Sequence, residues 1–327
     1  MKKLEHKNCI EKRIIGEKWI IYKIINVHCG WIYTLSFNYT HKMFATGSSD
    51  NIVRLWSLKS FKNLANFFGH VGAIKCVVFD EKHNSIFSGG DDLVIKYWDI
   101  EYNKNVRNYK GHISSIVKLI KYPSLNIILS GSRDNTVRLW DFRIRKEIMI
   151  LLGHKNTVTC LLSNSEKPHI ISGSLDNTIR FWDLVANKST LILKNFQNGL
   201  KEMHHIGKNG GFSALSSDSL NFYSKNGLLL RKMVNLVNSY DSFSVNQNND
   251  LMIGYSSGWI RYINFGSRNN SYFFRLFDKN QHNKMEEKSS SIGFNQKGDQ
   301  LLTVGIRNTI KVFSKRWFFL SKNKECF

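Results

Sequence analysis

The sequence is poor in proline, in long apolar runs and in acidic residues. Two of its 327 residues are proline, which argues against proline-rich linkers. No stretch approaches the length of an apolar membrane-spanning helix, and the first residues, MKKLEHKNCIEKR, contain no apolar run of the kind a signal peptide needs. We therefore expect a globular protein of the cytosol or nucleus that makes no membrane contact.

The cysteines are odd in number and scattered. They stand at positions 9, 29, 76, 160 and 326 and form no C-x-x-C pair. This distribution argues against a disulfide framework and against a zinc site. The chain also lacks the clustered acidic or metal-ligand set that an enzyme centre would need. We therefore expect no catalytic residue, no metal, no cofactor and no small-molecule substrate.

Acidic residues are scarce relative to basic ones. Asp and Glu number 25 against 47 Lys and Arg, which gives a formal net charge of +22. A charge of this size steers a protein toward polyanions and would bring it close to RNA. The alternative is that an A/T-rich genome has favoured Lys and Asn codons across a solvated surface. No run of five basic residues concentrates the charge, so both interpretations stay open.

The chain contains one sequence motif that is repeated four times. ATGSSDNIVRLW, FSGGDDLVIKYW, LSGSRDNTVRLW and ISGSLDNTIRFW end at Trp56, Trp98, Trp140 and Trp182, with a constant interval of 42 residues. A histidine keeps the same interval at His28, His70, His112 and His154, and a Gly precedes the last three. Asp follows the last three tryptophans. Fixed spacing of this length indicates a repeat architecture.

Each repeat predicts four short strands. In the second repeat, β-branched and aromatic residues fill four segments, at 64–68, 74–79, 85–88 and 94–98. The GH…WD spacing is the signature of WD-repeat β-propellers, whose blades are four-stranded sheets set radially. Beyond Trp182 the pattern decays, and strand rhythm alone predicts three more blades, with Tyr223, Ile263 and Phe313 at the Trp position. The predicted fold is an all-β, seven-bladed WD-repeat β-propeller.

The two ends of the array predict how the ring closes. Residues 18–27 alternate enough to form a strand before the first repeat, and such a strand can complete the last blade and remove its exposed edge. We predict a basic stub at 1–17, one propeller at 18–314 closed by this N-terminal strand, and a tail at 315–327. A polar stretch predicts an enlarged loop over 266–290, and the aromatic run 317–320 is expected to pack on the propeller.

A His, a Ser or Thr, an Asp and a Trp recur in each of the first four repeats. In WD-repeat proteins the His bonds to the Asp of a tight turn and reaches the hydroxyl and the Trp indole. The matching sets are His28/Thr46/Asp50/Trp56, His70/Ser88/Asp92/Trp98, His112/Ser130/Asp134/Trp140 and His154/Ser172/Asp176/Trp182. A Ser-His-Asp set could also suggest a hydrolase. An enzyme needs one such set, whereas a structural lock is needed in every blade, so we interpret the sets as structural.

The sequence also resembles a functional family. The segments FSGGDDLVIKYWDIEYNKNVRNYKGHISSIVKL (87–119) and GHKNTVTC…SGSLDNTIRFWDL (153–184) look like the pleiotropic regulator family of WD-repeat splicing factors. The lead-in WIIYKIINVHCGW (19–31) and the closing GDQLLTVGIRNTIKVF (298–313) resemble the ends of that family's propeller. The resemblance implies a nuclear, non-catalytic scaffold subunit of the NineTeen complex, which docks splicing proteins of that complex and of the spliceosome.

The resemblance to WD-repeat propellers also implies where partners bind. The exposed positions include the residue before each turn Asp, here Ser49, Asp91, Arg133 and Leu175, and the residue that begins each inner strand, here Trp31, Ala73, Ser115 and Thr157. Trp31 and Arg133 are the best candidates, because Trp and Arg are enriched at interface hot spots. Partial burial of Trp31 beneath a loop is the alternative.

A second class of function is suggested by Trp140-Asp141-Phe142-Arg143. This segment matches the W-D-x-R box of the WD-repeat substrate receptors of cullin-based ubiquitin ligases. Any WD repeat supplies two of its four residues, so the match carries less weight than the splicing resemblance.

Overall fold

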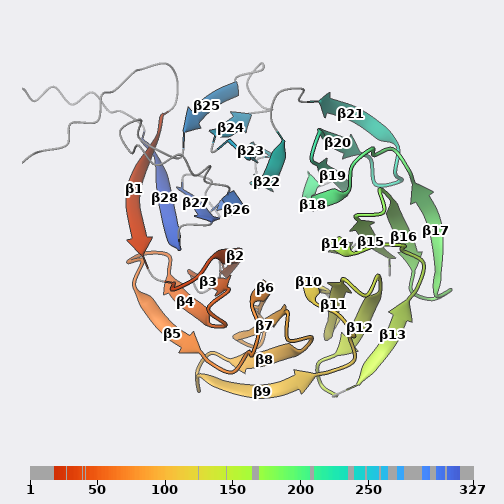
Figure 1. The fold of residues 1–327 in the computed structure, drawn as a ribbon, viewed down its shortest axis with the longest axis horizontal. Coiled ribbons are helices and arrows are strands. Elements are labelled where there is room, and N and C mark those ends of the chain that lie inside the picture. Colours follow the sequence, from red (N-terminus) through yellow and green to blue (C-terminus); the bar gives the residue numbers. More distant parts are fainter. Residues whose placement is uncertain are drawn as a thin grey trace, which may run out of the picture.

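The computed structural model describes residues 18–316, apart from 27, 39, 41, 124, 145, 164–168, 207–209, 235–238, 247–248, 258, 264–270, 276–288, 295–299 and 306–307. Every regular element in this part of the chain is a β-strand, so none of it is a helix that could span a membrane. The strands form seven four-stranded sheets, set radially around one axis (Figure 1). The predicted seven-bladed propeller is confirmed. The predictions for 1–17 and 317–320 lie outside the described residues.

Blades one to four are antiparallel meanders that run from the axis outward. Blade one contains β2 (Ile32–Asn38), β3 (Met43–Ser48), β4 (Val53–Ser57) and β5 (Asn63–Phe67). Blade two contains β6 (Ile74–Asp80), β7 (Ser85–Gly90), β8 (Ile95–Asp99) and β9 (Lys104–Tyr109). Blade three contains β10 (Ile116–Lys121), β11 (Ile127–Ser132), β12 (Val137–Asp141) and β13 (Glu147–Leu151). Blade four contains β14 (Val158–Ser163), β15 (His169–Ser174), β16 (Ile179–Asp183) and β17 (Lys188–Leu193).

Blades five to seven have the same order of strands without the full sequence pattern. Blade five contains β18 (Leu200–Ile206), β19 (Gly211–Ser216), β20 (Ser219–Tyr223) and β21 (Leu229–Val234). Blade six contains β22 (Tyr240–Val245), β23 (Leu251–Tyr255), β24 (Trp259–Ile263) and β25 (Ser271–Arg275). Blade seven contains β26 (Ser289–Phe294), β27 (Gln300–Gly305), β28 (Thr309–Arg316) and, outermost, β1 (Lys18–Asn26). Tyr223, Ile263 and Phe313 all lie in the third strand of their blade, as strand rhythm predicts.

The N-terminal strand closes the ring. β1 pairs antiparallel with β28, from Lys18 opposite Arg316 to Asn26 opposite Thr309. The two ends of the array therefore share one sheet, and this confirms the predicted closure. Strand β28 continues two residues past the predicted boundary at 314, because the start of β1 gives it a partner there.

The sequence repeat and the blade are offset by one strand. The four strands predicted for the second repeat occur within two residues of their expected bounds, but the first of them, β5, is the outer strand of blade one. Each repeat thus gives its first strand to the preceding blade. By the same rule β1, the first strand of the first repeat, belongs to blade seven, which explains why the ring closes as it does.

The enlarged loop predicted over 266–290 is wrong in part. Residues Ser271–Arg275 form β25, which pairs with β24 from Trp259 opposite Arg275 to Ile263 opposite Ser271. The polar residues on both sides hid a short aromatic strand, SYFFR, whose composition suits a β-sheet. Blade six thereby has its outer strand.

The hydrophobic core is divided among the interfaces between blades. The described residues form seven separate buried clusters, and each joins two neighbouring sheets. The repeated tryptophans are central to four of them: Trp98, for example, packs against Phe67 and Val53 of the preceding blade. Because each blade buries its faces on its neighbours, the ring gains stability by repetition. The loops at the blade ends therefore stand on a rigid base.

Candidate docking face and its structural locks

An Asp closes the turn between the second and third strands of each of the first four blades. In blade three, the Asp134 Oδ1 atom accepts a hydrogen bond from the Thr136 N–H at 3.0 Å. The residue between them, Asn135, has a φ of 65°, a left-handed conformation that Asn tolerates well. This turn leaves the other carboxylate oxygen of Asp134 free to point toward the loop that precedes the inner strand.

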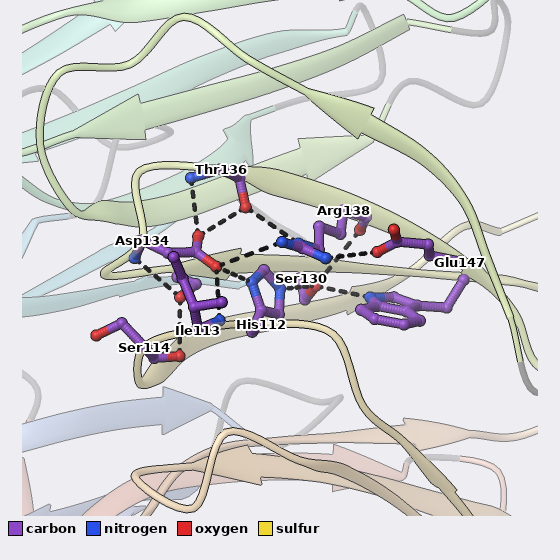
Figure 2. A network of polar contacts seen from close by, with 10 residues as sticks. His112, Ile113, Ser114, Ser130, Asp134, Thr136, Arg138 and Glu147 are labelled. Carbon is purple, nitrogen blue, oxygen red and sulfur yellow. Dashed lines mark hydrogen bonds and ion pairs between the residues drawn. The ribbon is translucent and has the colours of Figure 1, made fainter.

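A chain of hydrogen bonds then ties this turn to the Trp of the same blade (Figure 2). The Asp134 Oδ2 atom lies 2.6 Å from the His112 Nδ1 atom, and the His112 Nε2 atom lies 2.6 Å from the Ser130 Oγ atom. The indole N–H of Trp140 donates to the same hydroxyl at 2.8 Å. Since the hydroxyl accepts from the indole, it can donate to Nε2, and the Nδ1–H of His112 donates to the carboxylate. Each of the polar groups named here therefore has a hydrogen-bond partner.

The other three sets have the same geometry. The distances from His Nδ1 to Asp, from His Nε2 to the hydroxyl and from the indole nitrogen to the hydroxyl are 2.8, 2.8 and 3.0 Å in the His28 set, 2.7, 2.6 and 2.7 Å in the His70 set, and 2.9, 2.7 and 2.7 Å in the His154 set. All four hydroxyls, on Thr46, Ser88, Ser130 and Ser172, are fully buried. A substrate cannot reach them, so the geometry favours a structural role over a hydrolytic one.

The electrostatics of the sets support this role. Burial alone would raise the pKa of the Asp176 carboxyl, but hydrogen bonds from the Thr178 hydroxyl, a backbone N–H and His154 outweigh it, and the pKa is about 2. The pKa values of Asp50, Asp92 and Asp134 are lowered by hydrogen bonds in the same way. Burial lowers the pKa of His154 below 6.5 although the ring faces a carboxylate, and the same holds for His28. At neutral pH the locks therefore hold an ionised Asp, and in these two sets the His is neutral.

The predicted partner-binding positions lie beside the locks, at one edge of each blade. The N–H of the residue before each turn Asp donates to the carbonyl of the residue that begins the inner strand, at 2.9 Å in every case. The four pairs are Ser49 with Trp31, Asp91 with Ala73, Arg133 with Ser115 and Leu175 with Thr157. We call the edge formed by these pairs the docking face. The structure therefore brings both predicted sets of positions together.

The side chains of the docking face differ in exposure. Trp31 is 52% exposed, which leaves half of the indole available to a partner and half in contact with the propeller. Asp91, Arg133 and Leu175 are exposed, whereas Ser49 is half-buried. The indole of Trp31 meets the ring of Tyr33 edge-on, with the centroids 6.4 Å apart. Trp31 is thus both exposed and fixed in position.

A side-chain relay that sequence reasoning missed supports Trp31. The Lys75 ammonium lies 3.5 Å from the centroid of the Tyr33 ring and 3.5 Å from the Asp91 carboxylate. Asp91 in turn accepts a hydrogen bond from the Ser115 hydroxyl at 2.5 Å. The relay therefore links blades one, two and three at the docking face. Its signal was present, because Tyr33 and Lys75 occupy equivalent positions 42 residues apart, but a Tyr and a Lys at one repeat position do not predict a cation–π contact.

The W-D-x-R segment lies at the opposite edge of blade three. The Arg143 guanidinium donates to both carboxylate oxygens of Asp141, at 3.0 and 2.6 Å. Phe142 is buried between blades two and three, and its carbonyl accepts hydrogen bonds from Arg107 at 2.6 Å and from the Tyr109 hydroxyl at 2.9 Å. This segment therefore helps to hold the blade interface, and the Arg143 side chain remains at the surface.

The exposed basic residues are spread around the described part of the ring. Exposed Lys or Arg side chains occur in each of blades one to five and include Lys42, Lys62, Lys82, Lys104, Lys146, Lys188 and Lys225. Other cations are paired with carboxylates, as Arg138 is with Glu147 at 2.6 Å. Positive charge is therefore not confined to a single blade.

Comparison with known proteins agrees with this architecture. The family model described as WD domain, G-beta repeat matches residues 19–57, 61–99, 103–141 and 145–183. These ranges coincide with the four locked repeats, and each one begins at an outer strand and ends at a third strand. The chain is a seven-bladed β-propeller built on WD40 repeats, a scaffold type of fold.

One curated relative gives a narrower similarity. The chain is 33% identical over 58 residues to the pre-mRNA-splicing factor PRP46 of Kluyveromyces lactis. The matched stretch is 17% of this chain and 13% of that relative, so it spans a small part of either protein.

Proposed function

We propose that the protein is a non-catalytic scaffold in pre-mRNA splicing, which binds other proteins through the docking face. A fold alone does not define a function, so the proposal depends on the site. The observation that carries it is the exposed Trp31, which the relay of Tyr33 and Lys75 holds in place at the edge of three locked blades. Aromatic and Arg side chains on a rigid base are typical of interface hot spots.

The role in pre-mRNA splicing is proposed from sequence similarity. The matched relative is named a pre-mRNA-splicing factor, and segments 87–119 and 153–184 resemble the pleiotropic regulator family of splicing factors. On this basis we propose more specifically that the protein is a nuclear subunit of the NineTeen complex. It would act by positioning splicing proteins, with its basic surface close to RNA.

Docking of proteins is favoured over direct RNA recognition. Sequence-tolerant binding of RNA combines a basic groove with aromatic platforms on which bases stack. Here the exposed cations are distributed over several blades. The best-placed exposed aromatic residue, Trp31, contacts Tyr33, and Lys75 links Tyr33 to the carboxylate of Asp91. That arrangement suits a protein surface better than a phosphate backbone.

The test is affinity capture from the source cell with the tagged full chain, read by mass spectrometry and RNA sequencing. We expect splicing proteins and spliceosomal small nuclear RNAs. A Trp31→Ala/Arg133→Glu variant should lose them. The matched control is Tyr102→Ala/Lys104→Glu, which removes an exposed aromatic and reverses an exposed charge away from the docking face, at the turn into the outer strand of blade two. Capture of a cullin adaptor instead would favour the ubiquitin-ligase alternative, and equal loss in both variants would contradict the docking face.

A further inference from the structure

The outer strand of blade five exposes more large apolar residues than the outer strands of blades one to four. Leu229, Leu230 and Val234 of β21 are exposed, and so is Leu228 just before it, with Leu228 at 68% and Leu230 at 70%. The outer strands of blades one, two and three each expose a single large apolar residue, namely Leu64, Val106 and Ile148, and Phe68 and Leu152 are exposed directly after the first and the third of these strands. We call β21 with Leu228 the blade-five edge. A cluster of exposed large apolar residues is typical of an interaction site.

The patch continues onto the neighbouring blade. Gly227, in the turn that leads into β21, has a φ of 81°, and a Cβ added there would lie 2.8 Å from the Cδ2 atom of Leu191. The turn therefore packs directly against β17. Leu191 and Ile192 of β17 are themselves exposed. Strands β17 and β21 are the outer strands of the neighbouring blades four and five (Figure 1). The exposed apolar residues thus continue from one blade to the next.

The main chain of β21 is also available for pairing. β21 is the last strand of its sheet, so among the described strands it has a partner, β20, on one side only. Leu230 forms a bulge, after which the pairing is regular from Arg231 opposite Phe222 to Val234 opposite Ser219. The outer edge of a regular strand that ends its sheet can accept an added strand from another chain.

The charge around the centre of this patch is positive. Lys194, Lys225 and Lys232 are exposed on or beside the two outer strands, and Lys188, at the start of β17, lies opposite Asp183. Residues 184–234 contain two acidic residues, Glu202 and Asp218. Glu202 lies on an inner strand and accepts a hydrogen bond from the Phe243 N–H at 2.8 Å, and Asp218 accepts one from Asn198. Neither carboxylate is on the outer wall, so the patch complements an acidic partner.

These features distinguish between possible partners. A second copy of the chain would place its own Lys232 against this Lys232, and both copies carry a net charge of +22, so the two would repel each other. Lys on an edge strand also opposes self-pairing. RNA offers no aliphatic surface to cover the leucines, and the patch has no aromatic platform for its bases. A lipid surface cannot supply the N–H and C=O groups that the strand edge needs. An extended protein segment can carry acidic side chains for the lysines, apolar side chains for the leucines, and backbone N–H and C=O groups for the strand edge.

We infer that the blade-five edge is a second docking site, which binds an extended, alternately acidic and apolar segment of another protein as a fifth strand of blade five. The acidic side chains of that segment pair with the surrounding lysines, and its apolar side chains cover Leu228 and Leu230. This site lies apart from the docking face around Trp31 and does not depend on the splicing proposal.

The test uses the full chain and two synthetic decapeptides, one alternating Glu with Val and one alternating Lys with Val, with binding followed by fluorescence anisotropy. We expect the Glu/Val peptide to bind and the Lys/Val peptide not to bind. Leu230→Glu should weaken binding at least tenfold. Ile148→Glu is the matched control, because Ile148 is 50% exposed and occupies the same bulge position in β13. The bound peptide should slow hydrogen exchange at the amides of residues 231–234.

Several results would overturn the inference. These are absence of Glu/Val binding at millimolar peptide, equal binding of both peptides, equal effects of the two variants, and protection outside β21. Binding to phosphatidylserine vesicles or polyuridylate that Leu230→Glu abolishes would assign the edge to a membrane or to RNA. A dimer in sedimentation that this variant dissociates would assign it to a second copy. If Leu230→Glu lowers the melting temperature, Leu228→Glu takes its place.

Discussion

At the scale of single residues, the structure assigns different tasks to chemically similar side chains. Asp134 and Asp99 both cap turns of β-strands. Asp134 is part of a buried network with His112, whereas the Asp99 Oδ1 atom accepts from exposed backbone N–H groups, the nearer at 2.8 Å. Removal of Asp134 would leave a buried hydrogen-bond donor without an acceptor, whereas the donors to Asp99 are exposed to water. Substitution of each Asp therefore gives a matched pair of mutations.

Asp134→Ala should destabilise the fold far more than Asp99→Ala. The first change leaves the His112 Nδ1–H and the Ile113 N–H without their acceptor. Each unsatisfied group costs about 1–3 kcal/mol when it is buried, and the ring nitrogen is the more deeply buried of the two, so we expect a loss of about 2–4 kcal/mol. Asp99→Ala should cost under about 1 kcal/mol, because water can replace the carboxylate. Urea unfolding of both variants checks this, and equal midpoints would refute the lock.

The pH dependence of stability should follow the same groups in two stages. The folded pKa of His154 lies below 6.5, so the unfolded chain binds the proton more readily and stability declines as the pH falls below about 6.5. The folded pKa of Asp176 is about 2 against a usual 3.8, so a second decline is expected between about pH 4 and pH 2. Midpoints of urea unfolding, measured from pH 7 to pH 2, test whether stability declines as the pH falls. Asp176→Asn should reduce the low-pH slope, and an unchanged slope would contradict the assignment.

At the scale of elements, the N-terminal strand is the closing piece of the ring. Trp19 anchors it: the indole is 8% exposed and packs in a cluster with Tyr262, Phe294 and Phe313 of blades six and seven. Tyr22, three residues along the same strand, is 66% exposed. The attachment of β1 thus depends on one buried side chain as well as on its pairing with β28.

Trp19→Ala should therefore loosen the ring closure, and Tyr22→Ala should not. Truncation of a buried Trp costs about 3–5 kcal/mol, and part of that loss should appear as local opening of β1. We expect a lower melting temperature and faster hydrogen exchange at the β28 amides that pair with β1. If Tyr22→Ala has effects as large as these, Trp19 is not the anchor.

Prediction from sequence succeeded where a chemical pattern recurs and failed where the contact is particular to one place. The interval of 42 residues and the recurring His, Asp and Trp were enough to identify the residues of the four hydrogen-bonded sets. Strand rhythm and the alternating segment 18–27 were enough for the closed seven-bladed ring. The pattern was not enough for β25, because polar neighbours concealed SYFFR, or for the offset between repeat and blade, which only strand pairing reveals. The relay from Tyr33 to Asp91 joins different side chains in different blades, so the equivalent repeat positions of Tyr33 and Lys75 did not predict the contact.

At the scale of the whole molecule, the locks divide the ring into two unequal parts. Blades one to four contain the complete His/Asp/Trp sets, whereas in blade five Tyr223 replaces Trp and its hydroxyl accepts from Asn221 at 3.3 Å. We expect hydrogen exchange to be faster in β19 and β20 than in the equivalent strands β11 and β12, because less polar bonding opposes local opening. Equal protection would show that apolar packing alone sets the stability of the blades.

The net charge of +22 and the docking face make opposite predictions about salt. If affinity comes from neutralising RNA phosphates, binding to purified spliceosomal particles should weaken by orders of magnitude between 50 and 200 mM salt, as counterions are retained. If it comes from Trp31 and Arg133, the salt dependence should be shallow, because a half-exposed indole held by its neighbours binds mainly through apolar contact.

We expect the second outcome: Trp31→Ala/Arg133→Glu should weaken binding at least tenfold at both salt concentrations, and Tyr102→Ala/Lys104→Glu should not. A steep salt dependence together with wild-type affinity in the Trp31/Arg133 variant would identify the basic surface as the binding site. In that case the charge spread over several blades would contribute more to affinity than Trp31 does.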